Sequence, residues 1–205
     1  MALAKTHKRR MENNVKYIPT IIMLCLILSG CQFTTTIFTG ARKITTILID
    51  DRCFSDDLKD IQINMSLQEE FVKIDPKLGL DISITVFEGK VLLTGSIPNI
   101  DIIQQILEKT WSTPDVKQVY NYIRIADPPS LDVVNMDAAI SGSIRTQLTF
   151  TRHINSSNYK LTMENGALYI MGIAKNQAEL ERVISVIKNT SGVNEIINLT
   201  RFRKK

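Results

Sequence analysis

The chain repeats itself at a fixed offset, and this duplication constrains its fold more than any other feature. Gly89 and Gly95 recur 77 positions later as Gly166 and Gly172, and no gap is needed to keep the register. The same offset pairs Thr85 with Thr162, Asn99 with Asn176, Val116 with Val193, Asn121 with Asn198 and Arg124 with Arg201. Self-similarity at one long period indicates that a structural unit is present twice. We therefore expect two small domains of the same architecture.

Each copy begins with the pattern of an amphipathic helix followed by a strand. Apolar residues recur every four positions, which places them on one helix face. They are Ile63, Leu67 and Phe71 in the first copy, and Ile140, Ile144 and Leu148 in the second. Apolar residues then alternate with period two, as in a half-buried strand. These are Ile82, Ile84 and Val86, and then Tyr159, Leu161 and Met163.

A hairpin turn follows the first strand in each copy. Asn165-Gly166 is a strong signal for a type I′ turn, because both central residues of that turn need positive φ. Glu88-Gly89 takes the same place in the first copy, and return strands follow at residues 90–94 and 167–171. We assign four glycines to structural turns: Gly89, Gly95, Gly166 and Gly172.

A second helix and a last strand complete each copy. Asn99 and Asn176 precede the helices and have the side-chain oxygen that caps a helix N-terminus. The last strands are expected at residues 116–125 and 193–202. The order helix, strand, strand, helix, strand predicts an α+β fold. In each domain the helices pack on one face of a three-stranded mixed sheet.

The boundaries follow from this order and from two prolines between the copies. Pro128 and Pro129 lack amide donors and fix φ, so they indicate a short, stiff linker. The predicted segments are 1–30 (signal peptide), 31–56 (tether), 57–126 (first domain), 127–134 (linker) and 135–205 (second domain).

The N-terminus carries a short apolar run behind a basic segment. The run from Tyr17 to Leu28 is 12 residues long. A bilayer needs roughly 20 helical residues, whereas a secretory signal has an apolar region of about 7–15. A signal peptide is therefore favoured over a spanning helix, with an uncleaved anchor as the alternative. Met11 is an alternative start that keeps the same apolar run.

Cleavage of that segment changes the charge balance. The full chain has 25 basic and 21 acidic residues, and residues 1–30 hold five basic and one acidic residue. The chain from residue 31 onward is therefore neutral at 20 against 20, which removes the main argument for nucleic-acid binding. Residues 54–126 carry a net charge of −4 and residues 127–205 a net charge of +3.

The sequence contains no arrangement of residues that points to catalysis, a metal or a cofactor. After cleavage His153 is the only histidine, so a histidine-rich metal site is excluded. There is no P-loop and no dinucleotide fingerprint. Cys25 leaves with the signal, which leaves Cys31 and Cys53. We expect no enzyme activity.

Leu28-Ser29-Gly30-Cys31 resembles a bacterial lipoprotein signal. The resemblance implies cleavage between Gly30 and Cys31, and acylation of the cysteine with chains such as palmitate. Gln32, rather than Asp, implies sorting to the periplasmic face of the outer membrane. Cys53 would then be the only free thiol, so no intramolecular disulfide is expected.

Each copy resembles a BON domain. The stretches Glu88–Gly95 and Glu164–Gly172 carry most of the resemblance, and Ser191-Gly192-Val193 adds to it. A lipidated chain with two such units is similar to the dual BON-domain outer-membrane lipoproteins. The resemblance implies that the protein maintains envelope integrity and binds anionic phospholipid, chiefly phosphatidylglycerol, through the second domain. It also implies association with the outer-membrane protein assembly machinery.

The implied lipid surface is the first helix of the second domain, expected at residues 136–150. Ile140, Arg145 and Leu148 fit the family pattern there, whereas Ala139 replaces a membrane-inserting aromatic residue. Arg152, just beyond the helix, adds positive charge that favours an anionic bilayer. Two alternatives stay open. Ile140 and Leu148 also suit a helix core, and the modules also suit a protein–protein scaffold with lipid only as anchor.

Overall fold

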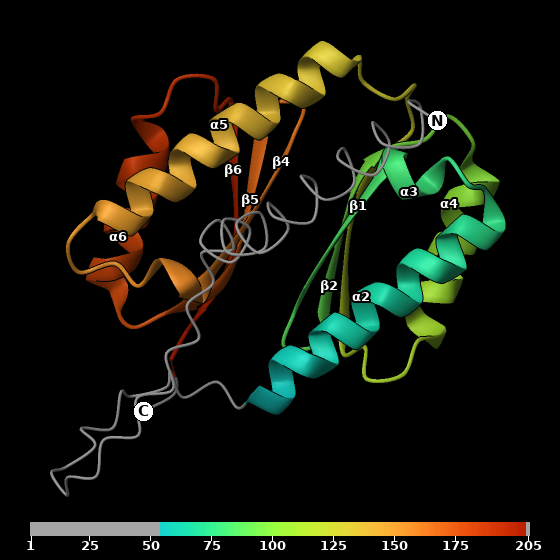
Figure 1. Ribbon diagram of the computed structural model, residues 1–205, viewed down its shortest axis with the longest axis horizontal. Helices are drawn as coiled ribbons and strands as arrows, with labels where there is room; N and C mark the ends of the chain where they lie inside the picture. Colours follow the sequence, from blue (N-terminus) through green and yellow to red (C-terminus); the bar gives the residue numbers. More distant parts are fainter. Residues whose placement is uncertain (1–53, 204–205) are drawn as a thin grey trace, which may run out of the picture. The chain divides into compact units, whose positions relative to one another are not determined.

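The computed structural model describes residues 54–203, with side chains from residue 56 onward. The first repeat runs α2 (Phe54–Ile74), α3 (Leu78–Asp81), β1 (Ile82–Phe87), β2 (Lys90–Ser96), α4 (Ile100–Ser112) and β3 (Gln118–Arg124). The second runs α5 (Leu131–Phe150), η1 (Ser156–Asn158), β4 (Tyr159–Glu164), β5 (Ala167–Ala174), α6 (Gln177–Lys188) and β6 (Glu195–Phe202). The predicted order of helix, strand, strand, helix and strand is confirmed in both repeats, and a short helical element, α3 or η1, is added before the first strand (Figure 1).

Each repeat forms a three-stranded mixed sheet, as predicted. The strand orders are β1-β2-β3 and β4-β5-β6. The hairpin strands pair antiparallel, and the last strand pairs parallel to the middle one after the helical crossover. Helices α2 and α4 lie on one face of the first sheet, and α5 and α6 on one face of the second (Figure 1).

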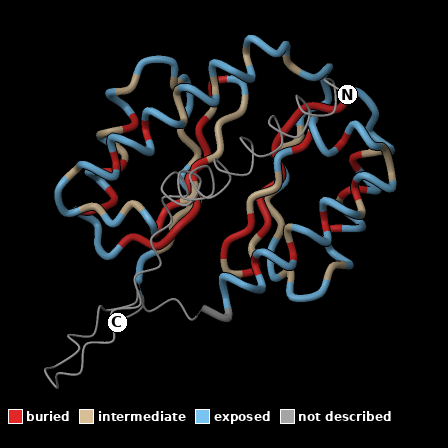
Figure 2. Tube along the Cα trace, viewed as in Figure 1, coloured by how far each residue is buried: buried red, intermediate tan, exposed pale blue. Residues whose placement is uncertain are grey.

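The core of each repeat lies between its sheet and its two long helices. The predicted four-residue period is buried in α2, where Leu67 and Phe71 are almost fully enclosed. Buried positions therefore follow the strands and the inward sides of the helices (Figure 2). Burying a large apolar side chain contributes about 1.5–3 kcal/mol, so this stripe holds each helix against its sheet.

The predicted helix caps are present. The Asn99 side chain accepts a hydrogen bond from the Asp101 N–H at 2.8 Å. The Asn176 side chain accepts one from the Glu179 N–H at 2.9 Å. Each bond satisfies one of the amide groups that a helix N-terminus leaves without a partner.

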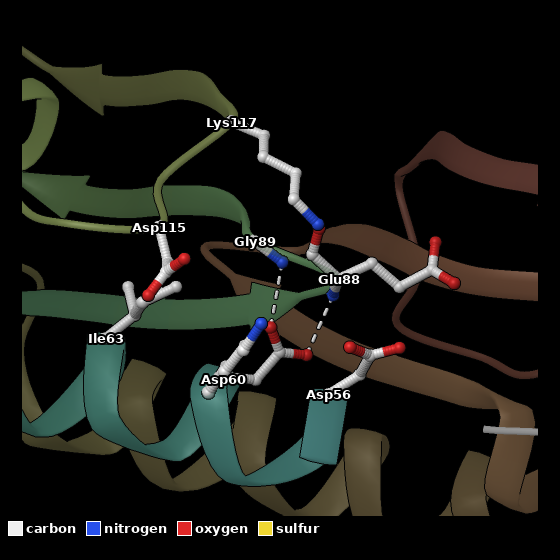
Figure 3. A pocket seen from close by; sticks show the side chains of 8 residues that line it. Asp56, Asp60, Ile63, Glu88, Gly89, Asp115 and Lys117 are labelled. Atoms are coloured by element: carbon white, nitrogen blue, oxygen red, sulfur yellow. Dashed lines mark hydrogen bonds between the residues drawn. The ribbon is translucent and has the colours of Figure 1, made fainter. Parts of the chain in front are cut away.

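A carboxylate on the first helix holds the hairpin turn of each repeat. Glu88 and Gly89 have φ of 54° and 75°, as a type I′ turn requires. Their N–H groups donate to the two oxygens of Asp60 at 2.7 and 2.8 Å (Figure 3). Asp137, 77 positions later, accepts in the same way from the next turn, at 2.5 and 3.2 Å.

Two of the four predicted turn glycines lie elsewhere. Gly95 and Gly172 are inside strands β2 and β5, so their assignment to turns is wrong. Their φ values of 136° and 154° lie in a region that residues with a side chain rarely adopt. A Cβ at Gly95 would lie 2.1 Å from the Asp81 carbonyl oxygen, and one at Gly172 would lie 2.2 Å from that of Asn158. Glycine is needed there for close backbone approach, not for reversal.

Helix α5 begins earlier than predicted. It starts at Leu131, inside the segment assigned to the linker and five residues before the expected start. The Ser130 carbonyl accepts from the N–H groups of Val133 and Val134 at 3.0 and 3.1 Å. Proline restricts the residue before it and cannot donate, but it leaves the residues after it free to form a helix. The connection between the repeats therefore shortens to residues 125–130.

The sheet faces opposite the helices form a third apolar cluster. Its buried members are Phe87, Leu92, Tyr169, Met171 and Ile173, drawn from both repeats. The rings of Tyr122 and Tyr169 meet edge to face, with centroids 4.9 Å apart. Thr85 Oγ1 and Thr162 Oγ1 are 2.7 Å apart, so a residue contacts its own counterpart in the duplication.

Equivalent arginines reach across from each repeat to the hairpin turn of the other. Arg201 Nε donates to Glu88 Oε2 at 2.7 Å, and its terminal nitrogen donates to Glu88 Oε1. Arg124 occupies the equivalent position in the first repeat. The Asn165 side chain is oriented with its amide oxygen toward Arg124, because only this orientation lets it accept hydrogen bonds from the guanidinium. The oxygen lies 2.7 and 3.2 Å from the two terminal nitrogens of Arg124. The reciprocal pairing is what a pseudo-two-fold relation between the repeats produces.

Replacing Asp60 with alanine should destabilise the chain by about 2–4 kcal/mol, because charge-assisted hydrogen bonds to two turn amides are lost. Asp137→Ala should cost less, since Asp137 is more exposed than Asp60. Urea unfolding measures both. Asp57→Ala, an exposed acid in the same helix, is the control and should stay within about 0.5 kcal/mol of the parent. Equal stability of Asp60→Ala and Asp57→Ala would contradict the structural role of Asp60.

Candidate functional site

The side of α5 that faces away from its sheet is unusually free of charge. Only three side chains in the 20-residue helix are charged: Asp132, Asp137 and Arg145. Asp137 is engaged by the hairpin turn, which leaves Asp132 and Arg145 exposed. The rest of the exposed surface of the helix consists mainly of small or uncharged residues. These are Asn135, Ala138, Ala139, Gly142, Ser143, Thr146 and Thr149.

Large apolar side chains stand at both ends of this helix. Leu131 is 79% exposed and Phe150 is 82% exposed, and Met136 adds a third at 59%. Scattered exposed apolar residues are normal on a protein surface. Together with a helix face that is uncharged but carries polar Asn, Ser and Thr side chains, they make this side of α5 a candidate interaction site. We call residues 131–150 that point away from the sheet the outer face of α5.

The rotation of α5 is fixed by its inward contacts. Ile144 and Leu148 are buried in the core, and Asp137 is bonded to the turn at Asn165 and Gly166. The outer face is therefore presented to the surroundings by the fold itself. No rearrangement is needed to expose it.

The predicted lipid-contacting residues fall on different sides of the helix. Leu148 is 1% exposed and Ile140 is half-buried against the core. Both side chains pack inward, as in the alternative in which Ile140 and Leu148 belong to the core of the domain. Arg152 is exposed just beyond the end of α5.

Arg145 is exposed, but its guanidinium is directed toward the edge of the sheet. A terminal nitrogen donates to the Leu161 carbonyl at 2.5 Å, and Nε lies 3.5 Å from Ser141 Oγ. This arrangement ties α5 to edge strand β4. Arg152 and His153 are exposed just beyond the end of the helix.

Sequence reasoning missed the apolar residues at the ends of the helix. Leu131 and Val134 lie in the segment that the two prolines predict as a linker, whereas the structure places them in the first turn of α5. The signal that would have found them is the absence of proline and glycine between residues 131 and 141. Phe150 was within the expected helix, but its exposure depends on where the helix ends.

A half-buried carboxylate, that of Glu164, lies at the hairpin turn of the second repeat. Burial raises the pKa of Glu164, Arg124 opposes this, and the Asp137 carboxylate adds to the increase. Arg124 is 3.9 Å away, too far for a hydrogen bond, and Glu164 Oε1 has no hydrogen-bond partner within residues 54–203. The charged form of Glu164 is therefore poorly compensated.

Glu164→Gln should stabilise the chain at neutral pH. Because the folded pKa of Glu164 is raised, the stability that protonation supplies is present at low pH and lost as the pH rises through the folded pKa. A glutamine side chain does not ionise, so the variant does not lose this stability as the pH rises. Thermal unfolding should show a higher Tm for the variant at pH 7 and a smaller difference at pH 4. Glu108→Gln, at an exposed site on α4, is the control. A variant whose Tm difference does not change with pH would contradict the assignment.

The residues that line a recess near the first hairpin have a structural role. Figure 3 shows Asp56, Asp60, Asp115 and Lys117 around it, with the Asp60 carboxylate directed at the turn amides. Lys117 Nζ donates to the Glu88 carbonyl at 3.2 Å.

Throughout residues 54–203, no group of three or more histidine, cysteine or acidic residues is placed to hold a metal ion. In the same part of the chain, no helix is both long and apolar enough to cross a membrane. Gly30, Cys31 and Cys53 lie outside the described residues.

Comparison with known proteins identifies both repeats. The BON domain matches residues 59–127 and again residues 136–204. An uncharacterised protein from Anaplasma centrale is 36% identical over 123 residues, covering 60% of this chain and 82% of that protein. A 21 kDa hemolysin from Actinobacillus pleuropneumoniae is 24% identical over 121 residues, covering 59% of this chain and 62% of that protein.

A third relative matches nearly end to end. The outer membrane lipoprotein DolP of Haemophilus influenzae is 18% identical over 190 residues, covering 92% of this chain and 96% of that protein. The two matched segments coincide with the two repeats of the structure and together cover more than half of the chain. The chain therefore belongs to the BON domain family and carries two BON domains in tandem.

Proposed function

We propose that this chain is a periplasmic lipoprotein of the outer membrane that supports envelope integrity and binds anionic phospholipid through its second BON domain. The observation that carries the proposal is the outer face of α5, which is uncharged over most of its length and bears exposed Leu131 and Phe150 at its ends. The full-length relative named as an outer membrane lipoprotein supports an envelope location.

The anchor in this proposal is Cys31. Acylation there fastens the chain to the membrane ahead of α2, which begins at Phe54. A tethered domain meets the bilayer at high effective concentration, so a second contact can be weak and still be occupied. The second contact supplies orientation and lipid preference, not retention.

The charge distribution favours an anionic bilayer for the second domain. Residues 127–205 carry a net charge of +3, whereas residues 54–126 carry −4. Arg152 and His153 are exposed just beyond the end of α5. A basic residue near an anionic surface contributes about 1 kcal/mol, and this attraction weakens with salt.

Ala139 shapes how this contact works. It is exposed on the outer face of α5, where the family resemblance implies an aromatic residue. Small side chains at this position and at Gly142 allow the helix to lie close to the headgroups. Insertion then depends on Phe150 and Leu131 at the helix ends, as in an interfacial amphipathic helix.

A double variant tests the contact. Phe150→Ser with Arg152→Glu should weaken binding of residues 31–205, unacylated through Cys31→Ser, to phosphatidylglycerol vesicles by roughly tenfold or more, since apolar area and charge are both lost. Co-sedimentation measures the binding. The matched control is Trp111→Ser with Lys77→Glu, which changes an exposed aromatic and an exposed base in the first domain.

Two results would contradict this lipid surface. One is equal loss of binding in both double variants, and the other is no binding of the parent at low salt. The second result, joined with recovery of a cross-linked envelope protein such as a member of the outer-membrane protein assembly machinery, supports the scaffold alternative.

Cys31→Ser in the full-length chain should abolish incorporation of radiolabelled palmitate, because Cys31 is the residue that carries the acyl chains in this proposal. Cys53→Ser is the control and should keep full incorporation. Label that survives Cys31→Ser would show that the anchor lies elsewhere.

A further inference from the structure

A groove of about 740 Å³ lies between strands β1 and β4, which are edge strands of the two sheets. Residues 82–85 line it on one side and residues 161–164 on the other. Thr85 and Thr162 meet across it, where the duplication brings equivalent residues together. None of its lining residues belongs to the recess near the first hairpin. We call this space the inter-strand groove.

Four backbone carbonyls flank the contact between Thr85 and Thr162, and three of them accept a hydrogen bond from a side chain. These bonds run from Asn64 to Ile84 at 3.0 Å, from Lys160 to Val86 at 2.6 Å and from Arg145 to Leu161 at 2.5 Å. The fourth carbonyl is that of Met163. Alternate residues of a strand direct their carbonyls to the same edge, so this carbonyl faces the same way as that of Leu161. Among residues 54–203, no side-chain donor reaches it.

The duplication explains this difference. Val86 corresponds to Met163 across the offset of 77 positions, and Lys160 corresponds to Ser83. Because the repeats are related by a pseudo-two-fold axis, Ser83 stands opposite the Met163 carbonyl as Lys160 stands opposite that of Val86. Ser83 does not have the alkyl chain and the ammonium group by which Lys160 spans the distance. On this side of the axis, the chain itself supplies no cation to the carbonyl.

A carboxylate lies beside the same carbonyl. Glu164 follows Met163 and takes the place that Phe87 has in the first repeat. Its side chain is only 15% exposed, and Oε1 has no hydrogen-bond partner in the described part of the chain. Arg124 approaches this oxygen only to 3.9 Å. A carboxylate next to an accepting carbonyl suits a primary ammonium group, which has three donors and no acceptor.

The charge of the inter-strand groove favours a cation. Three acidic side chains line it, those of Asp81, Asp137 and Glu164, against one basic side chain, that of Arg145. The Arg145 guanidinium is directed to the Leu161 carbonyl. A divalent metal ion fits less well than an ammonium group, because it takes six or more oxygen ligands. Within residues 54–203, no group of three or more suitable side chains is placed to hold one.

Apolar side chains extend the inter-strand groove away from these acceptors. Leu80 is 92% exposed and Val134 is 47% exposed, and both line it. Ile84 and Met163 line it as well and are half-buried. Methylene chains with a charged end pack along such surfaces and keep the charge at a polar site.

We propose that the inter-strand groove binds a linear aliphatic amine, with its primary ammonium group held by the Met163 carbonyl and the Glu164 carboxylate. The ammonium group takes the position that the Lys160 ammonium has on the other side of the pseudo-two-fold axis. The alkyl chain lies along Leu80 and Val134. This site is formed around β1 and β4, so it does not depend on lipid binding through α5.

A nuclear magnetic resonance titration tests the site in the chain from residue 31 with Cys31→Ser. The probe is n-butylamine, which is protonated at pH 7 like a lysine side chain. Saturable shifts are expected for the amides of Ser83, Thr85 and Glu164. The uncharged analogue n-butanol should not produce them at the same concentrations. No saturable shift, or equal shifts with both compounds, would overturn the proposal.

Two variants connect the binding to the named groups. Ser83→Lys should abolish the amine-induced shifts, because its own ammonium group then reaches the Met163 carbonyl. Ser185→Lys adds the same charge at an exposed site on α6 and should keep them. Glu164→Gln should weaken binding roughly tenfold, since a charge-assisted hydrogen bond becomes a neutral one. Binding that survives Ser83→Lys would contradict the site.

A further comparison separates a free amine from a lysine of a partner protein. Cadaverine and Nα-acetyl-lysine methylamide are titrated in parallel. Cadaverine should bind more tightly, because its second ammonium group can meet another acidic side chain of the groove, such as Asp81. Binding of the lysine derivative alone would overturn the assignment to a free amine.

Discussion

The arrangement of each domain depends on one interaction, the carboxylate of the first helix that binds both amides of the hairpin turn. Asp60 and Asp137 link the first helix of each domain, which packs through apolar contacts, to the hairpin turn that reverses the chain. An apolar stripe alone permits a helix to slide or rotate slightly. Two directed hydrogen bonds to a rigid turn remove that freedom. The rotation of α2 and α5 is therefore set, and with it the residues that each helix presents outward.

The two domains share this framework but differ on their outer faces. In α2 the outward side bears a narrow apolar seam between charged residues, whereas in α5 it is nearly uncharged with Leu131 and Phe150 at its ends. Duplication preserved the inward positions, where packing and turn chemistry limit substitution. The outward positions had no such limit. This difference is why we propose the lipid contact for the second domain.

Much of the fold was predictable because its signals are local. Asn165-Gly166, the caps Asn99 and Asn176, and the four-residue apolar period each determine structure within a few residues of themselves. The start of α5 was not predicted, because Pro128-Pro129 indicates a linker but does not show where that linker stops. Contacts between distant residues carried no signal at all.

Residues with two possible roles also limited the prediction of the site. A four-residue period places Ile140 and Leu148 on one face, but it does not say whether that face meets the core or a membrane. Arg145 matched a lipid-binding pattern, yet its guanidinium is directed to the carbonyl of Leu161 on an edge strand. Pairs such as Glu88 with Arg201 lie 113 positions apart, so only the folded chain brings them together.

The most direct test of the central claim is the environment of the outer face of α5 in the bound state. A polarity-sensitive fluorophore attached at Met136→Cys, in the chain from residue 31 without its native cysteines, reports that environment. With phosphatidylglycerol vesicles its emission should shift to shorter wavelength, whereas the same label at Ser112→Cys in the first domain should not shift. A bound chain with no shift at position 136, or with equal shifts at both positions, would contradict lipid contact through α5.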